Sequence, residues 1–388
     1  MDEAGGRAEA RSIRVTPVTG RRDLETFLSL PRRLYTDDPH FVMPLLMERR
    51  RHLSPRTNPW FEHAEARFWL AWRDGRPVGR ISAQVDRLVV ERHGAGHFGL
   101  LEAEDDPEVF AALLGTAEEF LAGHGLRRVL GPFNLSINHE CGLLVEGFDS
   151  PPRFMMGHAR PWYGPRIEQA GYAKAKDLLA YRWPFAPELP PRGHRLLRRF
   201  DGAGRLLVRD LRGRRRDEEL RTVLDIFNDA WGGNWGFVPF TEAELAHLVR
   251  SLSPLIQDDL VAIAEVDGEP AAMMVVLPNL NEAIADLDGR LLPLGWLRLL
   301  WRLRRQRFAT ARVPLMGVRR RYHGTPLGAL LMVRVFEAMG RAGWRRGLRE
   351  AELSWVLEDN RAVHNAALAV GAEVYKTYRI YGKALGPA

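Results

Sequence analysis

The sequence predicts an α/β fold of the α+β kind, made of two related domains that each carry a mixed, mostly antiparallel central sheet flanked by helices. Three observations support this prediction. The chain has 388 residues, which exceeds one ordinary hydrophobic core and suits two domains of common size. A strand, turn and strand pattern occurs twice, and a spaced pattern of Gly, Lys and Tyr also occurs twice in the same order. We therefore expect a duplicated domain.

The strand, turn and strand pattern lies around Asp74 in RFWLAWRDGRPVGRISAQV and around Asp267 in LVAIAEVDGEPAAMMVVL. In each copy an Asp-Gly pair separates two runs rich in apolar residues. Asp-Gly is favoured in the two-residue turns of antiparallel hairpins, because both residues tolerate positive φ angles. Both segments are therefore predicted to be hairpins.

The second repeated pattern joins GYAKAKDLLAY at 171–181 with GAEVYKTYRIY at 371–381. Gly, Lys and Tyr recur at the same spacing, so that Lys176 corresponds to Lys376. Each glycine follows a helical stretch, where a left-handed C-cap is expected, and precedes a strand. One such match could arise from simple composition, but two matches in the same order favour duplication.

Between the repeats, WPFAPELPPRGHRLLRRFDGAG is rich in Pro, Gly and Arg, as connectors are. We predict a disordered tail at 1–11, a first domain at 12–183, a linker at 184–204 and a second domain at 205–385. In the second domain the apolar periodicity predicts this order: helices near 218–230 and 242–252, the hairpin, a strand ending in ARVPLMGV, a loop and a long helix, the strand AELSWVL, a helix from about Asn360 and a final pair of strands.

Composition limits the classes of function. Hydrophobic residues make up 46% of the chain and charged residues 27%, as in folded proteins. A single cysteine, Cys141, excludes an internal disulfide and a cysteine-based zinc site. The polar N-terminus and the absence of a bilayer-spanning apolar run predict a cytoplasmic protein. The formal net charge is +7, but nearly all the cations are arginines, as codon bias produces, so we expect no nucleic-acid partner.

The order of elements in the second half resembles the GNAT superfamily of N-acyltransferases over residues 205–385, and more weakly over 12–183. In that superfamily a strand runs into a loop that begins a helix, as GVRRRYHGTPLGALLMVRVFEAM does here. Such a loop presents unpaired N–H groups and the positive end of a helix dipole, which together bind pyrophosphate. The resemblance implies acyl-CoA as co-substrate, no metal, and these cofactor-binding residues: Val318, Arg320, Arg321, His323, Gly324, Thr325, Gly328, Ala329 and Asn360.

The loop departs from the superfamily pattern. Alignment on GALL puts His323 at the usual Arg or Gln position, Pro326 at the first glycine and Gly328 at the second. Proline has no N–H, so one phosphate donor is missing, and an ordinary strand-to-helix turn with proline at its first position is the alternative. The tyrosine that protonates the leaving thiolate in many members corresponds to Ala367 here. Tyr375, Tyr378 and Tyr381 lie nearby in sequence and could substitute, and we predict Tyr381 as the catalytic one, against the alternative of a packing role.

An amine acceptor must lose a proton as it attacks, so a carboxylate is the expected base. Strand alternation places Glu352 on one face of its strand with Glu350 and Ser354, opposite an apolar face. Of the candidate bases Glu350, Glu352 and Glu358, we predict Glu352 as a catalytic residue. The alternative is a solvated carboxylate on the strand face.

The first domain carries a polar cluster, GPFNLSINHECGLLVEGFD, whose burial would require many hydrogen bonds. Its stretch GHFGLLEAEDDPEVF is acidic where CoA would need positive charge. We therefore predict that the first domain shapes the acceptor pocket and has a degenerate CoA site. Its predicted catalytic residues are Glu140 and His139, and its predicted substrate-binding residues are Asn134, Asn138 and Tyr163.

The segment LLPLGWLRLLWRLRRQRF at 291–308 joins leucines, Trp296 and Trp301 with five arginines. It is too short and too charged to span a bilayer, but it suits the headgroup region. The alternative is an amphipathic helix packed on the domain. An interfacial segment predicts peripheral contact with the inner membrane, and a lipid amine or a long-chain acyl-CoA as substrate.

The segments NPWFEHAEARFWLA, GPFNLSINHECGLLVEGFDSPP and AELSWVLEDN are similar to those of a family of tandem-GNAT bacterial proteins associated with bacterial ceramide synthase, which acylates a sphingoid-base amine. This resemblance implies an acyl-CoA-dependent N-acyltransferase whose acceptor is a long-chain lipid amine. Two alternatives stay open. One is an acetyltransferase for a small soluble amine or a protein, and the other is an inactive tandem module that only binds a ligand.

Overall fold

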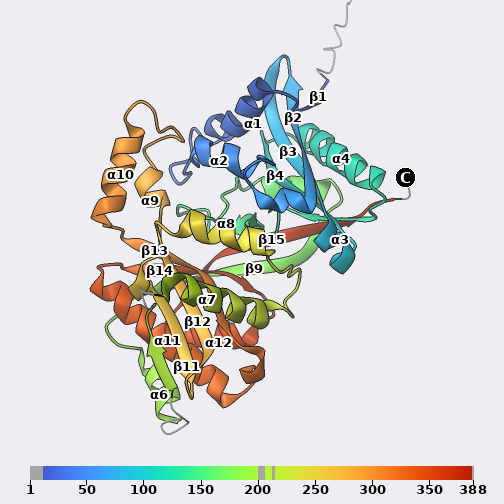
Figure 1. Ribbon diagram of the computed structural model, residues 1–388. Coiled ribbons are helices and arrows are strands. Elements are labelled where there is room, and N and C mark those ends of the chain that lie inside the picture. The colour runs from blue at the N-terminus through green and yellow to red at the C-terminus, as the bar shows by residue number, and fades with distance from the viewer. Residues whose placement is uncertain (1–11, 200–205, 212–214, 387–388) are drawn as a thin grey trace, which may run out of the picture.

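The computed structural model describes residues 12–199, 206–211 and 215–386. The tail at 1–11, predicted to be disordered, lies outside the described residues, as does the end of the predicted linker. Figure 1 shows two halves, each with strands and helices, that meet along a continuous band of strands.

The first half alternates strands and helices up to a long final strand. Its elements are β1 (Arg14–Pro17), α1 (Arg21–Leu34), α2 (Leu46–His52), η1 (Pro59–Glu62), β2 (Ala64–Arg73), β3 (Arg76–Asp86), α3 (Arg87–His93), β4 (Gly96–Ala103), α4 (Pro107–Gly123), β5 (Arg128–Gly131), β6 (Phe133–Asn134), β7 (Glu140–Cys141), β8 (Leu143–Glu146), α5 (Tyr163–Gln169) and β9 (Ala173–Pro184).

The second half repeats this order with a longer insertion before its fourth strand. Its elements are β10 (Leu206–Arg209), α7 (Arg216–Trp231), α8 (Glu242–Leu252), η3 (Asp258–Leu260), β11 (Val261–Val266), β12 (Glu269–Pro278), α9 (Asn281–Ile284), α10 (Gly295–Arg305), β13 (Thr310–Val318), η4 (Arg320–Tyr322), α11 (Pro326–Arg345), β14 (Glu350–Leu357), α12 (Arg361–Ala369) and β15 (Glu373–Ala384).

Both predicted hairpins are confirmed. β2 pairs antiparallel with β3, and β11 pairs antiparallel with β12. The φ angles are 51° at Asp74 and 74° at Gly75, and 52° at Asp267 and 84° at Gly268. Positive φ at both central residues is what a two-residue hairpin turn needs, which explains why the Asp-Gly pairs predicted these turns correctly.

The two repeated glycines also behave as predicted. Gly171 follows α5 and precedes β9, with a φ of 87°. Gly371 follows α12 and precedes β15, with a φ of 82°. A residue with a side chain would be strained in this left-handed conformation, so glycine ends the helix and turns the chain into the strand.

One sheet of thirteen strands runs through the described part of the chain, in the order β1-β2-β3-β4-β5-β15-β9-β14-β13-β12-β11-β10, with β8 also pairing with β15. Its two central strands are exchanged between the halves. β15 pairs with β5 of the first half, and β9 pairs with β14 of the second half. β9 and β15 also pair with each other, and Figure 1 shows both strands between the halves. The exchange joins the halves into one sheet.

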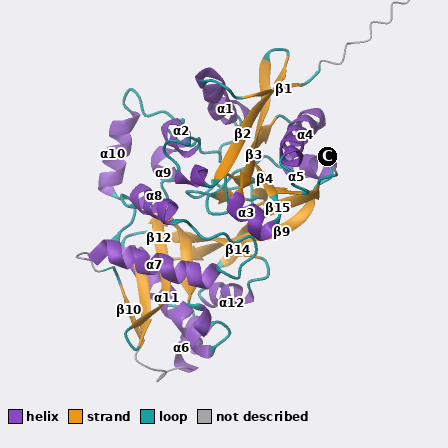
Figure 2. Ribbon diagram, turned by 45° about the vertical axis from the view of Figure 1, so that its right-hand side comes forward, coloured by secondary structure: helices purple, strands orange, loops and turns teal. Residues whose placement is uncertain are grey.

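Helices cover both faces of the sheet in the first half, as Figure 2 shows for α1 and α4 on either side of β2 and β3. α4 packs Phe110 against Ile81 and the core on one face. α1 packs Phe27 against Leu70 on the other face. Successive side chains of a strand point to opposite faces, so the buried strands need apolar residues at almost every position.

The second half has the same layers. On one face α11 packs Phe336 into a core with Ala262 and Ala264 of β11. On the opposite face α7 packs Ile226 with Val261 and Ile263 of the same strand. This double coverage explains why β11 is buried along its whole length.

The segment predicted to be a linker contains a helix, α6 (Pro191–Arg199). Its Leu197 joins a small buried cluster with Leu330 and Val333 of α11. The connection between the halves is therefore packed on the second half over its described residues.

Candidate active site

The parallel strands β13 and β14 part in the middle of the second half. They pair only along residues 310–313 of β13 and 350–353 of β14. Beyond this point β13 continues beside β12, and β14 continues beside β9. The facing edges of the two strands then have no partner strand among the described residues. An open strand edge can accept an extended chain that carries amide groups.

A cavity lies where the two strands part. Pro314 and Leu315 of β13 line it, together with Ser354 and Trp355 of β14. Both halves contribute to the rest of the wall, which is mostly apolar and aromatic. The remaining lining residues are Ile137, Asn138, His139, Met155, Phe227, Trp231, Asn234, Trp235, Phe237, Phe240, Leu248, Leu252 and Arg312. An apolar wall with a few polar groups is typical of a small-molecule site.

The corresponding place in the first half is filled by its own chain. β4 and β5 pair in parallel at only two positions, and β6 then lies against β4. The backbone N–H of Leu100 donates to the side-chain oxygen of Asn134 at 2.8 Å. A Cβ atom on Gly99 would lie 1.7 Å from the carbonyl oxygen of Phe133, so only glycine fits there. The first half therefore has no comparable opening between these strands.

His139 brings an uncharged imidazole to the cavity. Its Nδ1 lies 2.9 Å from the hydroxyl oxygen of Ser136, and its ring meets the ring of His52 edge-on at 4.7 Å. Burial lowers the pKa of His139 well below its ordinary value, and the charges of His52 and Arg49 lower it further. In the tautomer whose Nδ1 donates to Ser136, Nε2 carries a lone pair that no described residue occupies. His139 can therefore accept a proton from a ligand in the cavity.

Glu352 lies behind the cavity wall, where it is 1% exposed. The hydroxyl groups of Ser354 and Tyr375 donate to its two carboxylate oxygens. Arg312 Nε donates to the Ser354 hydroxyl oxygen at 2.9 Å, and Arg312 Nη2 donates to the Ser354 carbonyl oxygen at 3.1 Å. The alternative of a solvated strand carboxylate was wrong. Glu352 does not line the cavity but holds Ser354, which does.

Glu140 is an ion-pair partner inside the first half. The guanidinium of Arg49 donates to one of its carboxylate oxygens, and Asn134 Nδ2 donates to the other at 3.0 Å. Burial would raise the pKa of Glu140, but Arg49 and Asn134 outweigh it and hold this pKa below its usual range. Both carboxylate oxygens are therefore occupied, which leaves Glu140 and Asn134 as anchors of the loop that carries His139.

Asn138, next to His139, connects the two halves. Its side-chain N–H donates to the carbonyl oxygen of Val238 at 3.0 Å, and it also lines the cavity.

Burial raises the pKa of the neighbouring Cys141 to about 12, so its thiol stays protonated at neutral pH and is a weak nucleophile. No group of three or more His, Cys, Asp or Glu side chains in the described ranges could hold a metal ion.

The predicted phosphate loop leads from β13 through η4 into α11. Thr325 caps α11, because its hydroxyl oxygen accepts from the N–H of Gly328 at 3.1 Å. A Cβ atom on Gly328 would lie 2.2 Å from the carbonyl oxygen of Tyr322, so this glycine serves a close contact within the loop. His323 Nε2 lies 2.7 Å from the carbonyl oxygen of Val318. The N–H of Gly328 and the ring of His323, which were predicted to contact phosphate, are thus already hydrogen bonded within the protein.

The arginines of this loop face aspartates of α7. Arg319 donates to Asp225 at 2.6 Å, and the backbone N–H of Arg320 donates to Asp229 at 2.8 Å. Arg321 lies over the ring of Tyr322, 4.9 Å from its centroid. The loop keeps a net positive charge, since three adjacent arginines meet two aspartates.

Four more predicted site residues remain, and none of them lines the cavity. Asn360 caps α12, since its side-chain oxygen accepts from the N–H of Val363 at 3.2 Å, and Ala329 is the fourth residue of α11. The structure does not bring Tyr381 or Tyr163 to the cavity. Tyr381 lies on β15 in the core of the first half, where its hydroxyl donates to Glu168 at 3.1 Å and burial raises its pKa to about 12. Tyr163 lies in the same core, where its hydroxyl donates a hydrogen bond to Glu102 at 2.9 Å.

The aromatic wall of the cavity was not predicted from the sequence. It comes from the end of α7 and the segment that leads to α8, in FNDAWGGNWGFVPF. A run of Phe and Trp interrupted by glycines is too irregular to pack one helix face. This irregular aromatic run was the available signal for a ligand-binding segment.

Comparisons with solved structures show what fold this is. The chain is similar to a tandem GNAT protein from the clavulanic acid biosynthesis pathway, with a TM-score of 0.56 and 15% identity over 97% of this chain and all of that one. It is also similar to a GCN5-related N-acetyltransferase from Sphaerobacter thermophilus, with a TM-score of 0.53 and 14% identity over 97% and 96% of the two chains. The fold and its parted strands define a tandem GNAT-like protein.

Comparisons with curated sequences then show the family. The chain is 47% identical over 376 residues to bacterial ceramide synthase of Caulobacter vibrioides. The aligned residues cover 96% of this chain and 98% of the relative. It is 46% identical over 371 residues to Protein YghO of Escherichia coli, with 94% and 93% covered. The chain belongs to the family of these two proteins. No protein-family model matches it. Family and fold together support an acyltransferase.

Proposed function

We propose that this protein is an acyl-CoA-dependent N-acyltransferase that transfers a long acyl group to the amine of a long-chain lipid base, as a ceramide synthase does. The observation that carries this proposal is the mostly apolar cavity where β13 and β14 part, with a neutral His139 in its wall. The name of the Caulobacter relative, bacterial ceramide synthase, supports the same substrate class.

The open edges of β13 and β14 suit the arm of CoA, which carries amide groups and can pair with a strand edge. The pyrophosphate would lie at the positive N-terminus of α11, a helix of 20 residues. Pro326 lacks an N–H, and the N–H of Gly328 is bound to Thr325, so arginine side chains would supply much of the binding. The proposed residues remain Val318, Arg320, Arg321, His323, Gly324, Thr325, Gly328, Ala329 and Asn360.

The aromatic wall would hold the hydrocarbon chains of the substrates. Phe227, Trp231, Phe237 and Phe240 face the cavity from one side, and Leu315 faces it from β13. Each methylene group that leaves water for such a wall contributes about 0.8 kcal/mol. Long chains should therefore bind more tightly than an acetyl group. The closed strands of the first half support a single acyl-CoA site in the second half.

The chemistry requires one proton to move. The neutral amine attacks the thioester carbonyl carbon, a C–N bond forms, and the C–S bond breaks. His139 would accept the proton that leaves the nitrogen, and it would then give this proton to the departing thiolate. Burial favours this return, because an imidazolium with a lowered pKa gives its proton readily to a thiolate whose usual pKa is about 8.5. The products are an amide and free CoA.

Glu352 would act through Ser354 rather than on the substrate. Its carboxylate accepts from Ser354, whose hydroxyl oxygen in turn accepts from Arg312. Ser354 and Arg312 line the cavity, so the buried carboxylate fixes the polar groups that face the reacting atoms. In this proposal Glu352 is a positioning residue and His139 is the base.

The test is a transfer assay with the purified protein. Palmitoyl-CoA and acetyl-CoA are each offered with sphinganine, with spermidine and with a lysine-containing protein, and products are measured by mass spectrometry. We expect N-palmitoyl sphinganine and free CoA. Acetylation of spermidine or protein lysine in its place would contradict the proposal, and so would binding of palmitoyl-CoA with no transfer to any acceptor.

A further inference from the structure

We propose that α10 and the loop before it form a docking face for an anionic membrane surface. This proposal goes beyond the proposed reaction and does not depend on it. α10 has 11 residues, none of them buried. Among the described residues, no helix has the length and apolarity that would take it across a bilayer. The docking face would therefore lie along the membrane surface.

Six large apolar side chains of this face are exposed to solvent. Their exposed fractions run from 39% to 79%, which is unusual for leucine and tryptophan so close together in one segment. They are Leu292, Leu294, Trp296, Leu297, Leu300 and Trp301. Leu299 and Leu303 point the other way and pack on the second half. The helix thus has one face docked on the protein and a second apolar face that no described residue covers.

Arginines surround the exposed apolar side chains. Arg290, Arg304 and Arg307 are exposed and pair with no carboxylate of the described residues. Arg305 lies over the ring of Trp301, with 4.0 Å between its guanidinium carbon and the ring centroid. Arg298 lies 3.8 Å from Asp286, a weak pair. Leucine, tryptophan and arginine mixed on one helix face suit the headgroup region, where phosphates meet the arginines and acyl chains meet the leucines.

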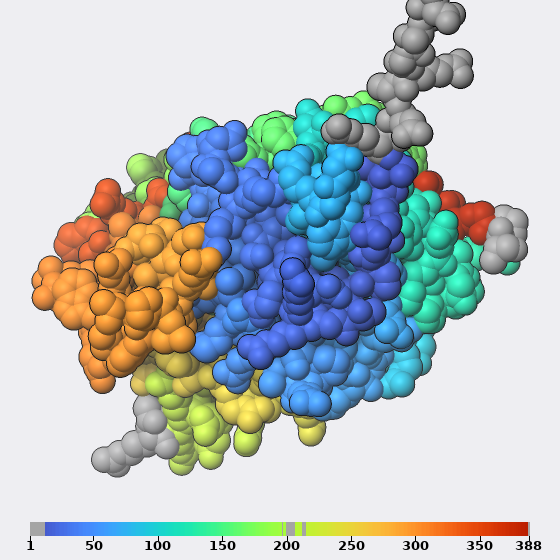
Figure 3. Space-filling view, turned by 90° about the horizontal axis from the view of Figure 1, so that it is seen from above, coloured from blue at the N-terminus to red at the C-terminus, as the bar shows by residue number. Residues whose placement is uncertain are grey.

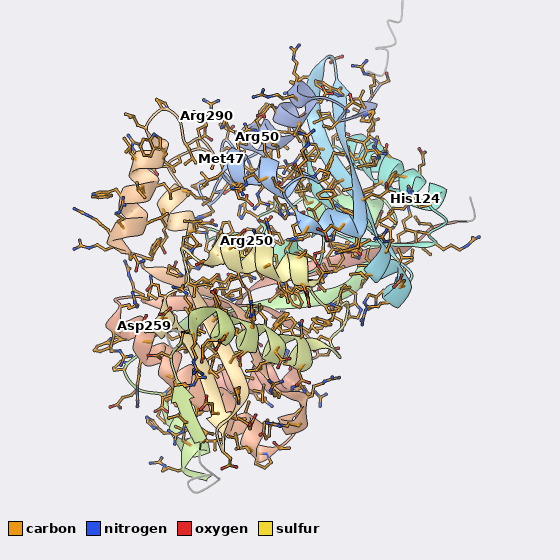
Figure 4. The ribbon with its side chains drawn as sticks, in the orientation of Figure 1. Met47, Arg50, His124, Arg250, Asp259 and Arg290 are labelled. Carbon is orange, nitrogen blue, oxygen red and sulfur yellow. The ribbon has the colours of Figure 1, made fainter. Side chains whose placement is uncertain are left out.

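The loop before α10 is fixed to the first half. The carbonyl oxygen of Gly289 accepts from the N–H of Leu46 at 3.0 Å, and Arg32 donates to Asp288 at 2.8 Å. Figure 4 places Arg290 near Met47, an exposed residue of α2. Figure 3 shows the α9 and α10 segment, in orange, at an outer edge of the molecule beside the first half. The docking face is therefore held rigidly and projects outward.

A membrane fits this face better than a protein partner does. A protein partner would have to bring several carboxylates to meet the unpaired arginines within an apolar contact. An anionic bilayer supplies both groups everywhere on its surface, and each arginine near it adds to the attraction. Peripheral docking would also place the chain where long-chain lipid substrates are dissolved.

The test is co-flotation with lipid vesicles. The full chain is mixed with vesicles of phosphatidylcholine alone, or with about one-third phosphatidylglycerol, and the bound fraction is measured. The apolar variant carries Trp296→Ser, Leu297→Ser and Trp301→Ser, and the charge variant carries Arg304→Gln and Arg307→Gln. The control carries Leu207→Ser, Trp344→Ser and Leu368→Ser, which are equally exposed apolar residues elsewhere.

We expect binding to the anionic vesicles that weakens in high salt, with about a tenfold loss of partition in either α10 variant and none in the control. These substitutions lie at exposed positions, so the melting temperature should not change. Equal binding of the α10 variants and the control would overturn the proposal. A salt-insensitive dimer in analytical ultracentrifugation that only the α10 variants lose would also overturn it, because a second copy would then cover this face.

Discussion

Ser354 donates its hydroxyl hydrogen to Glu352, and this single contact connects a carboxylate that is 1% exposed with the wall of the cavity. On the other side of Ser354, Arg312 donates to the same hydroxyl oxygen at 2.9 Å. A buried carboxylate whose two oxygens both accept hydrogen bonds is poorly placed to take a proton from substrate. His139 lines the cavity and is therefore the better candidate for the proton acceptor.

The first prediction concerns Ser354→Ala. The change leaves one oxygen of Glu352 and Nε of Arg312 without their partner in a buried place, which costs about 1–3 kcal/mol. We expect the free energy of unfolding, measured by urea denaturation, to fall by that amount. Ser29→Ala is the matched control, since the Ser29 hydroxyl donates only to carbonyl oxygens of its own helix, and it should change stability by less than about 0.5 kcal/mol. Equal effects of the two changes would contradict the linking role of Ser354.

The second prediction concerns His139→Gln. Glutamine keeps a polar side chain but cannot take the proton, so kcat/KM for acyl transfer should fall by about 10²- to 10⁴-fold. His124→Gln is the control, because His124 directly follows α4, at the far side of the molecule (Figure 4). It should retain full activity. Wild-type turnover in His139→Gln would remove His139 as the base.

The pH profile checks the same residue. The pKa of His139 lies well below 6.5, so the imidazole is already neutral at that pH. The value of kcat/KM should therefore not fall through this group until the pH drops well below about 6.5, where the ring becomes protonated. A decline centred at the ordinary histidine pKa, absent from the His139→Gln variant, would show that the ring is solvated.

A third prediction uses His97, which stacks on Phe133 at 4.1 Å. Burial lowers its pKa from 6.5 to about 3. Between these values the unfolded chain binds a proton that the folded chain refuses, so stability must fall as pH falls. Relative to His97→Phe, the wild type should lose up to about 1.4 kcal/mol per pH unit below about pH 6.5. Denaturant titrations between about pH 7 and pH 5 measure this difference, and a constant difference would contradict it.

A fourth prediction separates buried from exposed ion pairs. Glu140→Gln removes the charge that faces the guanidinium of Arg49, in a pair whose side chains are only 17% and 18% exposed, and it should lower the free energy of unfolding by about 3 kcal/mol. Glu373→Gln breaks the exposed pair with Arg182 and should cost less than about 1 kcal/mol. Urea denaturation of both variants measures the two losses in free energy of unfolding. Similar losses would show that Glu140 is not an anchor of its loop.

Local chemistry made much of the fold predictable. The Asp-Gly pairs at 74–75 and 267–268 specify hairpin turns by themselves, and Gly171 and Gly371 mark helix ends by their own conformational freedom. The strand exchange was not predictable in this way. A strand pattern shows which faces are buried, but it does not show which strand lies alongside.

The same limit explains the errors at the site. Tyr381 follows the second-half motifs in sequence, but β15 crosses into the first half and takes Tyr381 with it. Glu352 lies on the polar face of its strand, as expected, yet the fold buries that face between the halves. Sequence spacing identified the strand-to-helix loop but could not show that Thr325 uses the N–H of Gly328. These features depend on contacts between distant parts of the chain.

The proposed function requires that an acyl thioester binds where β13 and β14 part. The direct measurement is a calorimetric titration with palmitoyl-CoA of the wild type, of Leu315→Trp, which fills the cavity from β13, and of Leu207→Trp at an exposed position. We predict binding by the wild type and the Leu207 variant, and at least about tenfold weaker binding by a folded Leu315 variant. Equal affinity of all three proteins would contradict it.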